Sequence, residues 1–120
     1  MVKVLVVEDE IRISNLLRLY LEREAYQVDV VDNGKDGLEW ALKEDYHLIV
    51  LDVLMPFKNG YEILEEVRRI KKTPVVMLSA KCSEEDIKRG KDLGANEFIA
   101  KPFSPGMVVS KIKEILLQEM

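Results

Sequence analysis

Three unbroken apolar runs decide the fold of this chain: Val4-Leu5-Val6-Val7, Leu48-Ile49-Val50-Leu51 and Val75-Val76-Met77-Leu78. Strands buried on both faces of a parallel sheet have this unbroken pattern, whereas half-exposed strands alternate apolar with polar residues. Two further apolar runs are shorter and more polar, which is typical of sheet edges. We therefore predict five strands, over residues 2–7, 28–31, 48–51, 75–78 and 98–100, with the second and the fifth at the edges.

The segments between these runs have the periodicity of amphipathic helices. In the first helix the predicted buried stripe consists of Ile13, Leu16, Leu17, Tyr20 and Leu21. In the third helix it consists of Ile63, Leu64, Val67 and Ile70. The same pattern covers residues 108–116, and weaker helices fit residues 35–44 and 84–93. Strands that alternate with helices through short links predict one α/β domain over residues 1–120. Its parallel sheet has helices on both faces, because right-handed crossovers leave few other arrangements.

The composition excludes several classes of protein. Of the 120 residues 48% are apolar and 33% are charged, as in one globular domain, and the net charge of −4 gives no support for direct nucleic-acid binding. No apolar run approaches the roughly 20 residues of a membrane span, and the N-terminus has no signal-peptide pattern. We expect a cytoplasmic protein that has no membrane contact, and the single Cys82 cannot form an internal disulfide.

Polar and charged residues follow the predicted strands at one edge of the sheet. Glu8 and Asp9 end the first strand and Asp52 ends the third, while Ser79 and Lys101 end the fourth and fifth. Functional groups of open α/β sheets gather at this edge. Carboxylates that converge there repel one another, so they stay ionised only with a cation among them. Oxygen ligands without Cys or His favour Mg²⁺, with Mn²⁺ as an acceptable substitute.

This set of residue types also suits phosphoryl transfer. A carboxylate beside Mg²⁺ can attack phosphorus because the metal neutralises the phosphoryl oxygens. Lys101 would add a second positive charge, and the Ser79 hydroxyl would donate a hydrogen bond. Each residue alone has a plainer explanation, as a helix cap, a turn residue or a solvated charge. Their convergence at one edge is what favours a site.

Five motifs extend these observations over essentially the whole chain: Val6-Val-Glu-Asp-Glu10, Leu51-Asp-Val-Leu-Met-Pro-Phe-Lys-Asn-Gly60, Leu78-Ser-Ala80, Leu93-Gly-Ala-Asn-Glu-Phe98 and Lys101-Pro-Phe-Ser-Pro105. Together they resemble the receiver domains of two-component response regulators. The resemblance implies a doubly wound, flavodoxin-like (βα)5 fold with five parallel strands in the order 2-1-3-4-5.

The resemblance also implies how the acidic residues are used. It makes Asp52 the phosphoacceptor and places Asp9 and Asp52 directly on Mg²⁺, with Glu8 assisting through a water. The backbone carbonyl of Leu54 completes the protein ligands. The Leu54 side chain stands where the family tunes hydrolysis of the acyl phosphate, and an apolar residue there should hinder an attacking water.

Three further residues receive roles from the same resemblance. Lys101 pairs with the phosphoryl group, and its bond to Pro102 is expected to be cis. Ser79 and Phe98 take the hydroxyl and aromatic switch positions. In the switching hypothesis Ser79 moves toward the phosphoryl group and Phe98 rotates inward, which changes the face formed by the fourth helix, fifth strand and fifth helix.

The implied function is a switch rather than a conventional enzyme, because the domain catalyses only its own phosphorylation and dephosphorylation. A sensor histidine kinase supplies the phosphoryl group, and an output domain or downstream effector responds, with a homodimer as one consequence of activation. One alternative is a degenerate receiver that binds a partner without phosphorylation. A second alternative is an aspartyl phosphatase, but such an enzyme would need a carboxylate at the position of Leu54. A third is a flavin-binding protein, but the acidic run after the first strand would repel the flavin phosphate.

Overall fold

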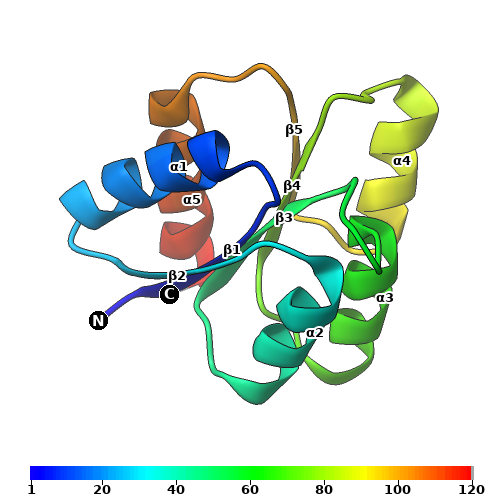
Figure 1. Cartoon of the computed structure of the whole chain (residues 1–120), viewed down its shortest axis with the longest axis horizontal. Helices are drawn as coiled ribbons and strands as arrows, with labels where there is room; N and C mark the ends of the chain where they lie inside the picture. The colour runs from blue at the N-terminus through cyan, green and yellow to red at the C-terminus, as the bar shows by residue number, and fades with distance from the viewer. Residues whose placement is uncertain (120) are drawn as a thin grey trace.

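The structure, a computed structural model, describes residues 1–119 and consists of strands and helices in strict alternation. Figure 1 shows the elements in chain order. Their bounds are β1 (Lys3–Val7), α1 (Ile11–Arg23), β2 (Gln27–Val31), α2 (Gly34–Lys43), β3 (Leu48–Asp52), α3 (Gly60–Ile70), β4 (Val75–Ser79), α4 (Glu84–Asp92), β5 (Glu97–Ala100) and α5 (Pro105–Glu119). Within residues 1–119, no helix has the length and hydrophobicity needed to cross a bilayer.

All neighbouring strands are parallel, and the five-stranded sheet has the order β2-β1-β3-β4-β5. This confirms the predicted order, with β2 and β5 at the edges. Each strand lies within one residue of its predicted bounds at either end. The agreement follows from burial, because every residue of β3 and β4 is buried and leaves an uninterrupted apolar signal in the sequence.

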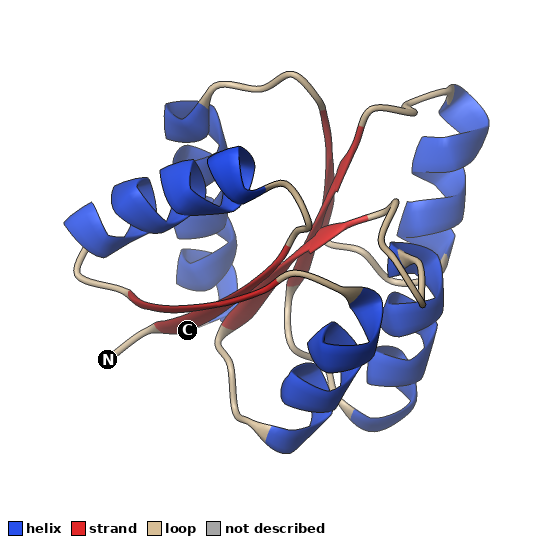
Figure 2. Ribbon diagram, viewed as in Figure 1, coloured by secondary structure: helices blue, strands red, loops and turns tan. Residues whose placement is uncertain are grey.

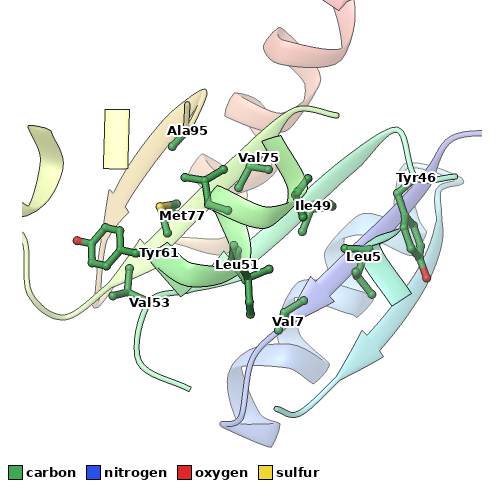
Figure 3. Close-up of a cluster of buried hydrophobic side chains, with 14 of the residues drawn as sticks. Leu5, Val7, Tyr46, Ile49, Leu51, Val53, Tyr61, Val75, Met77 and Ala95 are labelled. Atoms are coloured by element: carbon green, nitrogen blue, oxygen red, sulfur yellow. The ribbon is translucent and has the colours of Figure 1, made fainter. Parts of the chain in front are cut away.

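Helices cover both faces of the sheet, with α1 and α5 on one face and α2, α3 and α4 on the other (Figure 2). Successive residues of β1 alternate between the two cores, as the period of two in a strand requires. Val4 and Val6 join the core under α1 and α5, whereas Leu5 and Val7 join the opposite core. Figure 3 shows Leu5 and Val7 in that second core, on the side of β3 away from Val75 and Met77 of β4.

Two predicted stripe residues are corrected by the structure. Leu16 is 42% exposed, and Ile70 at the last position of α3 is 69% exposed. Leu17 and Leu21 are buried as predicted, and Ser14 is the third buried residue of α1. Ser14 can be buried because its hydroxyl donates to the Ile11 carbonyl at 3.2 Å, which satisfies the donor within the helix.

Side-chain caps begin three of the helices. Asn33 caps α2 by accepting a hydrogen bond from the Asp36 amide at 2.9 Å. Asn59 and Ser83 form capping boxes at the starts of α3 and α4. Because α2 and α3 begin at the carboxyl edge of the sheet, these caps also fix the loops that border the predicted site.

Candidate functional site

The carboxyl edge of the sheet brings together the residues predicted from the strand ends. Asp52 is the last residue of β3 and Ser79 is the last residue of β4. Glu8 and Asp9 follow β1, and the Lys101 amide donates to the Ser79 carbonyl at 2.8 Å directly after β5. The strands β1, β3, β4 and β5 are consecutive in the sheet, so all these residues lie along one rim.

Three carboxylates form a compact cluster on this rim. One oxygen from each of Glu8, Asp9 and Asp52 lies within 4.8 Å of the others. Asp9 is exposed, whereas Glu8 and Asp52 are only 1% and 4% exposed. The Lys101 ammonium lies 2.7 Å from Glu8 Oε1 and 3.3 Å from Asp52 Oδ2. One lysine therefore compensates two buried carboxylates.

The electrostatics show that this compensation is incomplete. Burial and the nearby Glu8 carboxylate together raise the pKa of Asp52 to about 7, although Lys101 opposes both effects. Burial lowers the pKa of Lys101, but its contacts with Glu8 and Asp52 outweigh this and raise it overall. Lys101 thus stays charged while Asp52 holds its negative charge only weakly, because Asp52 is buried and lies beside a second carboxylate.

A divalent cation fits this cluster. Glu8 Oε1 is buried and is ion-paired with Lys101, yet within residues 1–119 it accepts no hydrogen bond of good geometry. The donors are all carboxylate oxygens, and hard ions such as Mg²⁺ prefer such ligands. A cation among them would remove the repulsion that raises the pKa of Asp52.

The Ser79 side chain is oriented by the loop that follows β4. Its hydroxyl oxygen accepts a hydrogen bond from the Lys81 amide at 3.0 Å, and its carbonyl oxygen accepts one from the Cys82 thiol at 3.0 Å. A hydroxyl that accepts one hydrogen bond still has a proton to donate. Ser79 can therefore serve as a donor to an oxyanion that forms next to Asp52.

The remaining predicted residues occupy the neighbouring loops and β5. Phe98 is already buried, at 9% exposure, and its ring packs against Gly90 of α4. The bond between Lys101 and Pro102 is cis, as the resemblance implied. The side chain of Leu54 is 54% exposed and borders a pocket of about 180 Å³.

One charged residue at the site received no role from the sequence. Glu10 Oε1 lies 3.7 Å from Lys101 Nζ, and the Glu10 amide donates to Glu8 Oε2 at 3.1 Å. The only signal was its place in the acidic run, which does not say which carboxylate turns toward the lysine. Glu10 is 63% exposed in its side chain, so its contribution is screened by solvent.

Comparison with known proteins agrees with this geometry. A family model described as the response regulator receiver domain matches residues 4–113. The chain is 45% identical to the transcriptional regulatory protein ResD of Bacillus subtilis, with 95% of this chain and 48% of ResD covered. It is 40% identical to SrrA of Staphylococcus aureus, with 95% and 47% covered. The chain therefore spans about half the length of these two relatives.

A solved structure gives the same result at the level of the fold. The receiver domain of the Francisella response regulator 1452 has a TM-score of 0.95 and 28% identity, with 100% of both chains covered. The family model covers most of the chain, and the strand order and acidic rim are those expected of the family. This chain belongs to the family of response regulator receiver domains.

Proposed function

We propose that the domain accepts a phosphoryl group on Asp52 from the phosphohistidine of a sensor histidine kinase, in a Mg²⁺-dependent reaction. The observation that carries the proposal is the placement of the buried Asp52 carboxylate between two other carboxylates and the Lys101 ammonium. The raised pKa of Asp52 indicates a site that needs more positive charge than Lys101 provides. Phosphotransfer needs the same positive charge, because an anion must approach another anion.

The residues divide the chemistry between them. An Asp52 oxygen attacks phosphorus while the bond from phosphorus to the donor's imidazole nitrogen breaks, and the electron pair stays on that nitrogen. Asp9, Asp52 and the Leu54 carbonyl would hold Mg²⁺, with Glu8 assisting through a water. The bound ion would neutralise the phosphoryl oxygens. Lys101 then exchanges a carboxylate partner for a phosphoryl oxygen, and Ser79 donates its hydroxyl proton in a hydrogen bond.

Phosphorylation changes the charge at the rim and so provides the signal. The phosphoryl group adds almost two negative charges and three acceptor oxygens. Ser79 and Lys101 would move toward it, and the movement would reach Phe98 and the face of α4, β5 and α5. An output domain, a downstream effector or a second copy of the domain would read that face. The domain acts only on itself, as a switch.

The degenerate receiver, which binds partners without phosphorylation, is not favoured. Such a protein would have lost the acceptor, a metal ligand or the lysine, whereas Asp52, Asp9 and Lys101 are all present at the same rim. Burying two carboxylates and a lysine costs folding free energy. Retention of that arrangement is more readily explained by use of the site.

The proposal is tested by intact-mass spectrometry after incubation with acetyl phosphate. We expect the wild-type domain to gain one phosphoryl group with Mg²⁺ present and none with EDTA. Asp52→Asn should gain none under either condition. Asp32→Asn is the matched control, because Asp32 is an exposed carboxylate just after β2, outside the cluster. A phosphorylated Asp52→Asn variant, or an unmodified wild type, would contradict the proposal.

A further inference from the structure

The loop between β3 and α3 carries the Leu54 carbonyl, which the proposed function uses as a magnesium ligand. This loop covers residues 53–59. Val53 is buried, whereas Leu54 and Pro56 are exposed and Phe57 at the tip is 86% exposed. Its first residue is held at both ends, because the Val53 amide donates to the Leu78 carbonyl and the Val53 carbonyl accepts from the Gly60 amide. Residues 54–58 need further contacts to take one conformation.

Met55 packs against the hydrophobic core, and Lys58 forms an ion pair with Glu66 at 2.8 Å. A further contact comes from Gly34, the first residue of α2, which is distant in sequence. The Gly34 amide donates to the Pro56 carbonyl at 3.1 Å, and the Lys58 amide donates to the same carbonyl at 2.9 Å. The amide of a first helical residue has no partner within its own helix. Here that free donor binds the loop instead, so the N-terminus of α2 fixes the loop two residues after Leu54.

The approach of the loop to Gly34 leaves no room for a side chain. A Cβ atom on Gly34 would overlap the carbonyl oxygen of Lys58. It would also lie 2.7 Å from the carbonyl carbon of Lys58 and 2.9 Å from the Cβ of Lys58. The helix is already packed closely on β1, because Gly37 lies so near Val7 that a Cβ at that position would be 2.6 Å from the Val7 side chain. Of the two partners, the exposed loop is the one able to move.

We propose that Gly34 is a positioning residue for the magnesium site, because it seats the loop that presents the Leu54 carbonyl. The inference rests on the proposed function, in which that carbonyl is a ligand. Gly34 itself touches neither the ion nor the phosphoryl group. Its role is to let the loop approach α2 closely while its amide holds the Pro56 carbonyl.

The test compares the Mg²⁺ affinity of Gly34→Ala and Gly37→Ala by calorimetric titration of MgCl₂. Both substitutions add one methyl group to α2 where space is short, but only the one at Gly34 faces the loop. We expect Gly34→Ala to weaken Mg²⁺ binding about tenfold, the lower end of the effect of residues that support metal ligands. Gly37→Ala should lose stability and keep the wild-type affinity.

Two further measurements separate positioning from general damage. Amide chemical shifts of Gly34→Ala without metal should change over residues 53–59 and remain unchanged in β5. Phosphorylation by acetyl phosphate should recover when Mg²⁺ is raised in proportion to the lost affinity. If Gly34→Ala does not fold, the double variant Gly34→Ala/Phe57→Gly replaces it, because a glycine at position 57 lets the loop move away from the added methyl group. The double variant should still bind Mg²⁺ more weakly than Phe57→Gly alone.

The outcomes distinguish this inference from the proposed function. Wild-type affinity in Gly34→Ala, or an equal loss in Gly37→Ala, would overturn the role of Gly34 and leave the phosphorylation of Asp52 standing. A wild-type domain that binds no Mg²⁺ would overturn the proposed function, and the inference with it.

Discussion

Phe57 has a backbone conformation that suits glycine. Its φ is 72°, and it is the central residue of the turn that the Lys58 amide closes onto the Pro56 carbonyl. For a residue with a Cβ atom, this left-handed region costs roughly 1–2 kcal/mol of conformational free energy. The side chain of Phe57 offsets little of that cost by packing, because it is 86% exposed.

Replacing Phe57 with Gly should therefore stabilise the domain. We expect a gain of about 1 kcal/mol, which corresponds to a rise in Tm of about 4–6 °C for a domain of this size. Thermal unfolding followed by circular dichroism measures it. Phe57→Ala is the control, because it removes the ring and keeps the Cβ atom. An equal gain in both variants would mean that the exposed ring, and not the backbone, is unfavourable.

Asp52 should make the stability of the metal-free domain depend on pH. Burial raises its pKa from 3.8 to about 7 on folding. A carboxyl that binds its proton more tightly when folded contributes stability at low pH, and this contribution is lost as the pH rises through the interval between those two values. Asp52→Asn should therefore be more stable than wild type by about 2–4 kcal/mol near pH 8.

Urea unfolding in EDTA measures this difference. The advantage of Asp52→Asn should shrink as the pH falls to about 5, where wild-type Asp52 is protonated in the folded state. The exposed Asp32→Asn control should change little at either pH. If Asp52→Asn were the less stable protein near pH 8, the carboxylates would not be in electrostatic conflict.

At the scale of elements, α4 has the fewest buried residues of the five helices. Gly90 is its one buried residue, and it packs against the ring of Phe98. From α3, the Tyr61 hydroxyl donates to the Asp86 carbonyl at 3.2 Å, and the Arg89 guanidinium lies 4.1 Å from the centre of the Tyr61 ring. Few contacts have to change for α4 to move, which suits an element of the proposed output face.

The contact between Gly90 and Phe98 predicts opposite effects for two glycine substitutions. A Cβ on Gly90 would lie 2.7 Å from Phe98 Cδ2, so Gly90→Ala should cost about 1 kcal/mol even though Ala favours a helix. Gly106→Ala in α5 would meet only the Ser104 hydroxyl at 3.7 Å and should stabilise by about 0.5–1 kcal/mol. Chemical unfolding measures both, and stabilisation by Gly90→Ala would show that α4 is not packed on Phe98.

For the whole molecule, the same burial pattern predicts a gradient of local stability. The strands β1, β3 and β4 lie inside the sheet and have helices on both faces, whereas α4 has one fully buried residue, Gly90, and one half-buried residue, Ile87, that packs on the core. Amide hydrogen exchange should therefore be slowest in β3 and fastest, among the helices, in α4. Protection of α4 equal to that of β3 would contradict this account of its packing.

Much of the molecule was predictable because burial leaves a direct trace in the sequence. Two-sided burial made β3 and β4 unbroken apolar runs, and their shared direction placed Asp52 and Ser79 on one rim. Contacts between distant loops leave no such trace. The fit of Gly34 against Lys58 depends on how α2 approaches the loop after β3, and the distance from Glu10 to Lys101 depends on side-chain conformations.

The central claim is that Asp52, and neither of the other two carboxylates in its cluster, captures phosphorus. Borohydride reduces an aspartyl phosphate to homoserine, so peptide mass spectrometry after treatment with acetyl phosphate, Mg²⁺ and borohydride locates the acyl phosphate. We predict homoserine at position 52 and unmodified Glu8 and Asp9. Reduction at position 8 or 9, or homoserine at no position, would contradict the account.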